Sequence, residues 1–280
     1  MTLKMTANAK INSILSVEGK REDGYHLIDS VFQSVSLSDK IKLKKDKNVS
    51  LLCNVKELGD DQNIAIKAAK MFFGETEING GVKIKLKKKI PLAAGLGGGS
   101  ADAAAVLLGL NKLYDTKLSA ECLKAMALKL GADVPFFLEG GTVRAKGVGE
   151  EMTKLNPFRE GFFILLKIGT KPSTGEMYRK LDSENPKKPL VEEFAAAIEN
   201  GDTETVIKLF DNSFKCCWKK SEAEQILRQT ADAVSLTGSG PTWFGFYKDK
   251  HKAKKAYKTI KKRYKFCYLV KPSEKAVIFE

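Results

Sequence analysis

The chain of 280 residues is 43% hydrophobic and 29% charged, with a formal net charge of +14. These values are typical of a globular protein and exclude a disordered chain, and the length allows two ordinary domains or one large one. No apolar run approaches the roughly 20 residues of a membrane-spanning helix. Residues 1–10 also lack the apolar segment of a secretion signal, so we expect a cytoplasmic protein without a membrane contact.

Residues 1–150 predict a mixture of strands and helices. Strands are expected at 11–17, 30–37, 41–44 and 82–90, the last one ended by Pro91. Helices are expected at 63–73, stopped by Gly74, at 101–113, and from an N-cap at Ser119 to Gly131.

The second half begins with a buried strand at 161–168 and a charged loop at 182–189, followed by short helices at 191–199 and 203–210. A compact set of elements follows, with strands at 233–237, 242–247, 266–270 and 276–279 and a basic helix after the second strand. This order favours an α+β sandwich with helices on one face of an antiparallel sheet.

The cysteines disfavour a structural zinc site. They are odd in number, they contain no C-x-x-C spacing, and only two histidines accompany them. Buried reduced thiols are therefore the expected state of Cys53, Cys122, Cys216, Cys217 and Cys267.

The positive charge is concentrated in residues 248–265, where ten Lys or Arg residues stand against one Asp. Lys83, Lys85 and Lys87 alternate with apolar residues, as on the wet face of a half-buried strand. We interpret both features as solvated faces. A basic nucleic-acid-binding protein is the alternative, although few aromatic residues are interleaved with the lysines.

A glycine-rich loop after the strand at 82–90 predicts an anion site. Its glycines bring backbone N–H groups close to a ligand, and the helix that follows adds unpaired N–H donors. The loop lacks the Gly-Lys-Ser/Thr of a Walker A motif and the last glycine of the dinucleotide fingerprint, so both are excluded. A flexible turn is the alternative. The loop residues that we expect to bind a triphosphate are Pro91, Leu92, Ala93, Ala94, Gly95, Leu96, Gly97, Gly98, Gly99, Ser100 and Ala101.

This loop resembles the phosphate-binding loop of the GHMP kinases. Three other stretches resemble the same family in the same order: residues 9–12 with 21–26, residues 131–137, and residues 236–241. The triple glycine is most similar to members that phosphorylate a cytidine diphosphate-linked methylerythritol. The resemblance implies an N-terminal ribosomal-protein-S5-like domain (1–152) and a C-terminal ferredoxin-like α/β sandwich (153–280). It also implies ATP and Mg²⁺ as cofactors, with the residue that holds Mg²⁺ left open.

Asp133 and Lys10 are the expected catalytic residues. Asp133 lies on a turn beside apolar residues, where a carboxylate can act as a base or cap the next helix. Lys10 lies in an apolar stretch, although a surface lysine is the usual alternative. The resemblance implies that Asp133 is the base and that Lys10 pairs with it.

The resemblance also implies a set of ligand-binding residues. Tyr25, on a turn, can stack on a flat ring or pack in a core, and His26 can hydrogen-bond a base edge. The turn at 238–240 is either a simple hairpin or a contact to the acceptor. The expected substrate-binding residues are Asn12, Tyr25, His26, Tyr178, Gly238, Ser239 and Gly240, and Asn63 is expected at the adenine.

The sequence therefore predicts a two-domain α+β small-molecule kinase, a monomer or weak homodimer that binds no nucleic acid. The alternative functions are those of a GHMP kinase for mevalonate, homoserine or a sugar, and of the basic nucleic-acid-binding protein.

Overall fold

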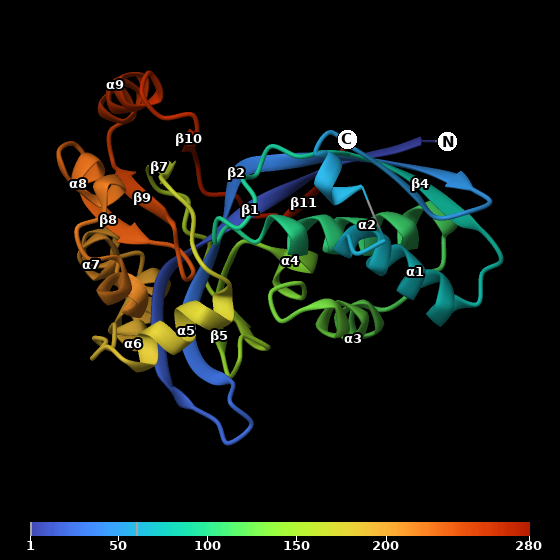
Figure 1. The fold of residues 1–280 in the computed structure, drawn as a ribbon, viewed down its shortest axis with the longest axis horizontal. Helices are drawn as coiled ribbons and strands as arrows, with labels where there is room; N and C mark the ends of the chain where they lie inside the picture. Colours follow the sequence, from blue (N-terminus) through green and yellow to red (C-terminus); the bar gives the residue numbers. More distant parts are fainter. Residues whose placement is uncertain (1, 60) are drawn as a thin grey trace.

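Two β-sheets lie side by side in the computed structural model, which describes residues 2–59 and 61–280. Within these residues one sheet has seven strands and the other has four. The long strands β1 and β2 pair along most of their length and reach from the larger sheet to the smaller one (Figure 1). This arrangement agrees with the expected α+β class.

The larger sheet carries its helices on one face, seen below it in Figure 1. In β4 the apolar residues are buried and lysines alternate with them, as expected for a strand with one solvent-exposed face. The elements of this part are β1 (Thr2–Lys20), β2 (His26–Asp46), β3 (Ser50–Cys53), β4 (Gly81–Lys87), β5 (Thr142–Lys146), β6 (Glu151–Lys154), β11 (Val277–Phe279), α1 (Ile64–Thr76), α2 (Gly98–Tyr114), α3 (Ala120–Leu130), α4 (Phe136–Glu139) and the 3₁₀ helix η1 (Lys56–Leu58).

The smaller sheet is antiparallel, in the order β10-β7-β9-β8, and it is buried on both faces. In β9, Phe244 and Phe246 pack toward α6, α7 and β1, whereas Trp243 and Tyr247 pack toward α8 and α9. The elements of this part are β7 (Phe162–Lys167), β8 (Ala233–Leu236), β9 (Thr242–Tyr247), β10 (Cys267–Val270), α5 (Thr174–Asp182), α6 (Val191–Glu199), α7 (Thr203–Leu209), α8 (Glu222–Arg228), α9 (Lys250–Lys261) and the 3₁₀ helix η2 (Ser213–Trp218).

The expectation of helices on one face of the smaller sheet is wrong. Its central strand β9 is buried over all six residues, because a continuous apolar run fits a strand that is covered on both sides. Gly74 does not stop α1, which continues to Thr76 and ends at Glu77 in a left-handed conformation. By contrast, α3 begins after Ser119 and ends at Gly131 as expected.

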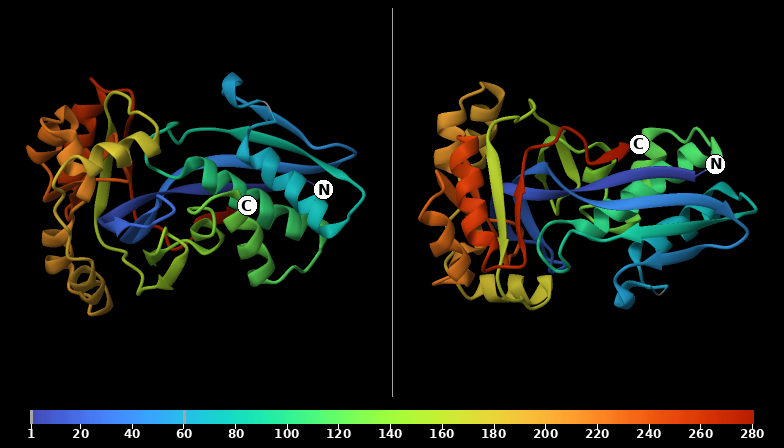
Figure 2. Two further views of the ribbon diagram at one scale, coloured as in Figure 1. Left: turned by 60° about the horizontal axis from the view of Figure 1, so that its bottom comes forward. Right: turned by 90° about the horizontal axis from the view of Figure 1, so that it is seen from above.

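The C-terminal strand returns to the larger sheet, where β11 pairs with β1 (Figure 2). The expected second unit, residues 153–280, therefore contributes to both sheets, and the expected boundary after residue 152 falls within β6. A three-residue strand carries too little pattern to reveal its partner, which explains why its place could not be read from the sequence.

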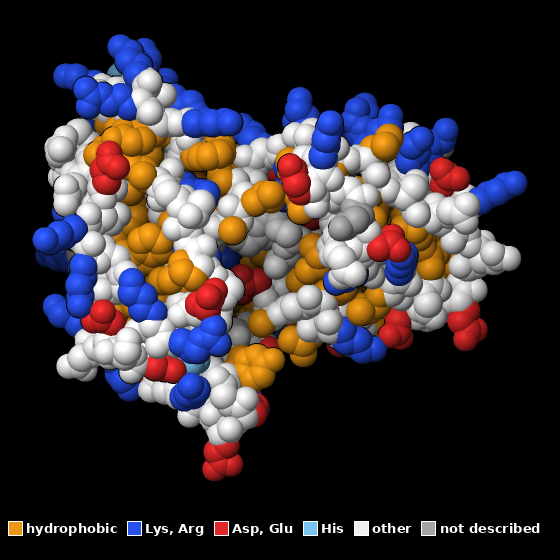
Figure 3. All heavy atoms as spheres, in the orientation of Figure 1, with side chains coloured by type: hydrophobic (Ala, Val, Ile, Leu, Met, Phe, Trp, Pro, Cys, Tyr) orange, Lys and Arg blue, Asp and Glu red, His pale blue; other side chains and the backbone are white. Residues whose placement is uncertain are grey.

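The basic segment forms α9, whose lysines are exposed while Ala253, Ala256 and Ile260 are buried. Figure 3 shows Lys and Arg side chains gathered over this helix at the upper left. Among the described residues, every helix is too short or too polar to cross a membrane. The cysteines are all free; Cys217 and Cys267 are buried as expected, but Cys122 is exposed.

Candidate active site

The glycine loop connects β4 to α2 and takes left-handed conformations at Ala93, Gly95 and Gly97. Helix α2 begins at Gly98, three residues earlier than expected, so Gly98, Gly99 and Ser100 form its first turn. The backbone N–H groups of such a turn have no partners within the helix and are available to an anion. The strand, the glycine loop and the helix therefore follow one another in the predicted order, but the helix also includes Gly98, Gly99 and Ser100.

Two loop glycines are required by close packing. A Cβ atom at Gly95 would lie 2.6 Å from the carbonyl oxygen of Thr237, and one at Gly97 would lie 2.5 Å from the Phe137 ring and 3.1 Å from Cγ of Lys10. The loop thus rests directly on the β8–β9 turn, on α4 and on Lys10. The alternative of a flexible turn does not fit these contacts.

Gly97→Ala should therefore lower the melting temperature, because the new methyl group meets Phe137 at a backbone angle that L residues rarely adopt. We expect a loss of at least about 1–2 kcal/mol of unfolding free energy. Thermal unfolding measures it. Gly99→Ala is the matched control: its Cβ would meet only Ile64, at 3.5 Å, so its stability should not fall. Equal stability of the two variants would contradict the prediction.

Most other loop residues hold the loop in place. Ala94, Leu96 and Ala101 are buried in the core, and the Leu96 carbonyl accepts a hydrogen bond from the Lys10 backbone N–H. The residues that line the cavities described below are Ala93, Gly95, Gly97 and Ser100, while Leu92 is exposed.

Lys10 is buried in β1 with 4% of its surface exposed, so the surface-lysine alternative is wrong. Its Nζ donates a hydrogen bond to Oδ1 of Asn12 at 2.8 Å and lies 3.5 Å from Oδ2 of Asp133. The same ammonium group lies 4.6 Å from the centre of the Phe32 ring, a cation–π contact. The pairing of Lys10 with Asp133 that the resemblance implied is present.

Asp133 lies on the turn between α3 and α4, and its side chain is 39% exposed. It does not cap the next helix: the N-cap position of α4 is Pro135, and no side chain makes a capping hydrogen bond there. Its carboxylate is therefore not used to cap a helix, and it lies partly exposed beside the ammonium group of Lys10.

Two cavities meet at Asp133. The first, of about 390 Å³, is lined by Lys10, Gly95, Gly97 and Lys171 among others. The second, of about 800 Å³, is lined by Tyr25, His26 and Ser100 among others. The residues that line both cavities are Ile28, Asp133, Thr174 and Tyr178. One carboxylate thus stands between the glycine loop and an aromatic-lined space.

Asn12 is buried, with 2% of its surface exposed, and its side chain is used within the protein. Oδ1 accepts hydrogen bonds from Lys10 Nζ and from the Gly238 backbone N–H at 2.9 Å, and Nδ2 donates to Ser30. Its backbone N–H donates to Thr237 Oγ1. Asn12 therefore joins Lys10 to the β8–β9 turn; that it also contacts substrate stays a prediction.

The turn at 238–240 is a hairpin connection between β8 and β9, and it also reaches the site. Gly238 and Ser239 line the first cavity, and Gly238 packs against Gly95. The Ser239 carbonyl accepts a hydrogen bond from the indole N–H of Trp218, whose ring packs on Gly240. The turn is therefore a hairpin that also borders the cavity, and its contact with the acceptor stays a prediction.

His26 and Tyr178 stack on each other, with ring centres 4.4 Å apart and planes 19° apart. Nε2 of His26 lies 2.6 Å from Oδ1 of Asp182. Burial, and secondarily the charge of Asp133, raise the pKa of Tyr178 to about 12, so it is a neutral ring. Tyr25 is 65% exposed on the turn before β2, which excludes the core-packing alternative for it.

Asn63 is the N-cap of α1: its side chain accepts a hydrogen bond from the Ala65 N–H and donates one to the Leu58 carbonyl. Both polar ends are thus occupied, and a contact with adenine stays a prediction.

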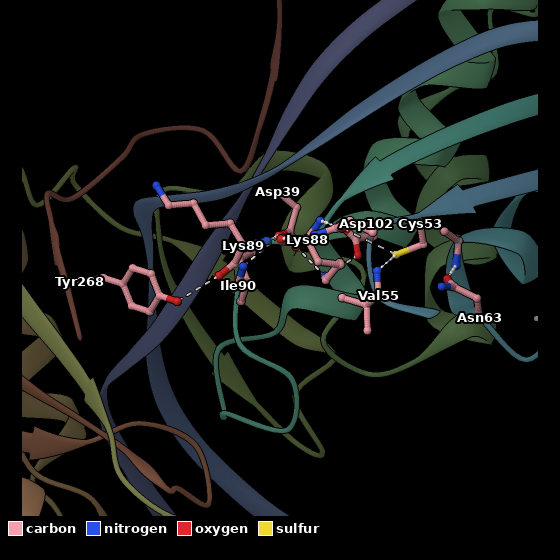
Figure 4. A network of polar contacts seen from close by, with 11 residues as sticks. Asp39, Cys53, Val55, Asn63, Lys88, Lys89, Ile90, Asp102 and Tyr268 are labelled. Carbon is pink, nitrogen blue, oxygen red and sulfur yellow. Dashed lines mark hydrogen bonds and ion pairs between the residues drawn. The ribbon is translucent and has the colours of Figure 1, made fainter. Parts of the chain in front are cut away.

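A buried charge cluster beneath the loop was missed by the sequence analysis. Lys88 Nζ lies 2.5 Å from Asp39 Oδ2 and 2.6 Å from Asp102 Oδ2, with all three residues less than a tenth exposed (Figure 4). Asp39 Oδ1 also accepts the backbone N–H groups of Lys89 and Ile90. The cluster joins β2, the residue that follows β4 and the second turn of α2.

The cluster contains two carboxylates and one ammonium group. Burial raises the pKa of Asp102 to about 8; Lys88 opposes this shift and Asp39 adds to it. Burial lowers the pKa of Lys88, but the two carboxylates outweigh burial and raise it overall. Lys88 therefore stays charged, and the pKa of Asp102 is raised because two buried carboxylates share this one ammonium group.

Comparison with known proteins gives the class of protein. Residues 63–141 match the GHMP kinases N terminal domain and residues 194–265 match the GHMP kinases C terminal domain, together more than half of the chain. The chain belongs to the GHMP kinase family.

Its relatives include enzymes with a cytidyl substrate in their name. A 4-diphosphocytidyl-2-C-methyl-D-erythritol kinase of Clostridium perfringens strain 13 is 41% identical, with 94% of this chain and 95% of the relative covered. The enzyme of that name from Thermoanaerobacter pseudethanolicus is 38% identical over 98% of both chains.

Solved structures agree with the fold. A crystal structure of 4-(cytidine 5'-diphospho)-2C-methyl-D-erythritol kinase is 31% identical, covers 96% of this chain and 99% of its own, and has a TM-score of 0.80. A homoserine kinase from Cytophaga hutchinsonii has a TM-score of 0.79 at 18% identity, over 100% of this chain and 97% of its own, and supports the fold alone.

Proposed function

We propose that this protein transfers the γ-phosphoryl group of ATP to the 2-hydroxyl of 4-diphosphocytidyl-2-C-methyl-D-erythritol, in the non-mevalonate route to isoprenoid precursors. The observation that carries the proposal is the position of Asp133, which lines both the cavity at the glycine loop and the cavity at Tyr25 and His26. A donor phosphate and an acceptor with a flat base would meet at this carboxylate. The names of relatives at 38–41% identity support the same acceptor.

In the proposed reaction, Asp133 takes the proton of the acceptor hydroxyl as its oxygen attacks the γ-phosphorus. The bond between that phosphorus and the β,γ-bridging oxygen breaks, and the electron pair leaves with ADP. Lys10, 3.5 Å from Asp133 and held by Asn12, orients the carboxylate and stabilises the negative charge at the transfer point. The protein thus contributes position and charge.

The triphosphate would lie at the glycine loop, against the N–H groups of residues 98–100. The described residues contain no cluster of three or more His, Cys, Asp or Glu that could hold a metal by itself. This fits Mg²⁺, which is commonly held by phosphate oxygens and water with one or two protein groups. We assign the Ser100 hydroxyl, in the first turn of α2, as such a group. Bound Mg²⁺ would neutralise phosphate charge.

The cytosine would lie beside Tyr25, with the stacked His26–Tyr178 pair as the second aromatic surface. Tyr25 is exposed beside the cavity, so its ring is available to a planar base.

The expected result in an ADP-release assay is turnover with the cytidyl acceptor and none above background with mevalonate or homoserine. The latter two have no ring for the aromatic surface to hold. Mass spectrometry of the product should show one added phosphoryl group. Turnover with mevalonate or homoserine in place of the cytidyl acceptor would overturn the proposal in favour of another GHMP kinase activity.

A further inference from the structure

Lys171 is a second cation at the site, in the segment between β7 and α5. Its Nζ donates hydrogen bonds to Ser239 Oγ at 2.6 Å and to Thr174 Oγ1 at 3.0 Å. Ser239 belongs to the β8–β9 turn and Thr174 is the first residue of α5. Two hydroxyls from different elements therefore hold this ammonium group at one place in the cavity wall.

The ammonium group of Lys171 has no carboxylate partner among the described residues. Within residues 2–59 and 61–280, no Asp or Glu forms an ion pair with Lys171. Burial, and then repulsion by Lys10, lower the pKa of Lys171. A half-buried cation held only by hydroxyls and repelled by a neighbouring cation is costly unless an anion joins it.

The charged side chains that line the first cavity carry a net charge of +1. Lys10 and Lys171 contribute two positive charges, and Asp133 contributes one negative charge that is already paired with Lys10. The cavity at the glycine loop is thus suited to an anion that contacts Lys171.

The position of Lys171 indicates which anion it would bind. Lys171 lines the first cavity, together with Gly95, Gly97 and Lys10, and it does not line the aromatic cavity, although its partner Thr174 borders both. In the proposed reaction the phosphoryl group passes to the acceptor beside Lys10 and Asp133, and both of these residues line the first cavity. The diphosphate of the acceptor would lie closer to the base, toward the second cavity.

We propose that Lys171 binds the phosphoryl group during its transfer and keeps hold of it in the phosphorylated product. The inference rests on the proposed function and adds a residue to it. Lys171 and Lys10 would approach the transferred group from two sides, Lys10 from β1 and Lys171 from the entrance to α5. The ammonium group would supply the charge stabilisation that phosphoryl transfer requires.

The test compares Lys171→Met, Lys171→Arg and the wild-type protein. Turnover gives kcat and KM, and calorimetry gives the affinities for the cytidyl acceptor and for its 2-phosphate. For Lys171→Met we expect kcat to fall about 10²-fold and the affinity for the 2-phosphate to fall about tenfold, with acceptor affinity unchanged. Lys171→Arg keeps the charge and should retain most of both. Lys167→Met is the matched control, because Lys167 lies four residues earlier, over the Phe266 ring.

Three outcomes would overturn the inference. Equal loss of affinity for the acceptor and its 2-phosphate would assign Lys171 to the acceptor's own diphosphate. An Arg variant as impaired as the Met variant would show that charge is not its role. Unchanged kcat and affinities would remove Lys171 from the reaction while leaving the proposed function intact. A wild-type protein without turnover of the acceptor would instead overturn the proposed function, and this inference with it.

Discussion

Asp133→Asn should lower kcat by about 10²- to 10⁴-fold, the range that a positioned general base contributes. The amide has nearly the same size as the carboxylate but cannot take the proton of the acceptor hydroxyl. It also leaves Lys10 without the partner that lies 3.5 Å away. Steady-state kinetics with saturating ATP and acceptor measure the change, and binding of both substrates should stay within a few-fold of wild type.

The matched control for this variant is Asp115→Asn. The Asp115 side chain is 83% exposed at the C-terminal end of α2, whereas the glycine loop lies at the N-terminal end of this helix. Its kinetics should equal those of wild type. An Asp133→Asn enzyme with near wild-type kcat would remove Asp133 as the base and leave only a positioning role.

Lys88→Met should destabilise the protein by about 3–5 kcal/mol, the typical cost of leaving a buried charge without its partner. The substitution keeps the length of the side chain but leaves Asp39 and Asp102 facing each other in the core. Urea unfolding measures the loss. Lys87→Met, one residue earlier on the exposed face of β4, should change stability by no more than about 0.5 kcal/mol.

A double variant separates charge from packing. Lys88→Met with Asp102→Asn removes one of the two carboxylates as well, while Asp39 keeps the N–H groups of Lys89 and Ile90. We expect the double variant to be more stable than Lys88→Met alone. If it is less stable, the loss comes from packing or from the removed hydrogen bonds and the charge argument fails.

Lys88 could in principle have been found from the sequence. Val82, Ile84 and Leu86 mark the buried face of β4, and the same period of two places residue 88 on that face. A lysine at an inward position requires a buried partner. Asp39 and Asp102 could not have been chosen as those partners, because they lie 49 and 14 residues away along the chain.

The conformation of the glycine loop was determined locally. Backbone freedom, the turn before a helix and the unpaired N–H groups of the first helical turn all depend on neighbours in sequence, so the loop and the helix that follows it could be predicted from the residues alone. Helix α3, which begins after Ser119 and ends at Gly131, could be predicted for the same reason. Resemblance added the roles of Lys10 and Asp133, which residue type left undecided.

The tertiary structure determines which side chains from distant parts of the sequence come into contact. It brings Asp133 to Lys10, stacks His26 on Tyr178 across 152 positions of sequence, and places Ser239 against Lys171. It also buries β9 on both faces and returns the C-terminus to the first sheet. Local preferences specify a strand or a loop, whereas the partner of a side chain depends on packing between distant segments. The residues alone therefore predicted an anion-binding loop, and the fold placed an aromatic-lined cavity beside it.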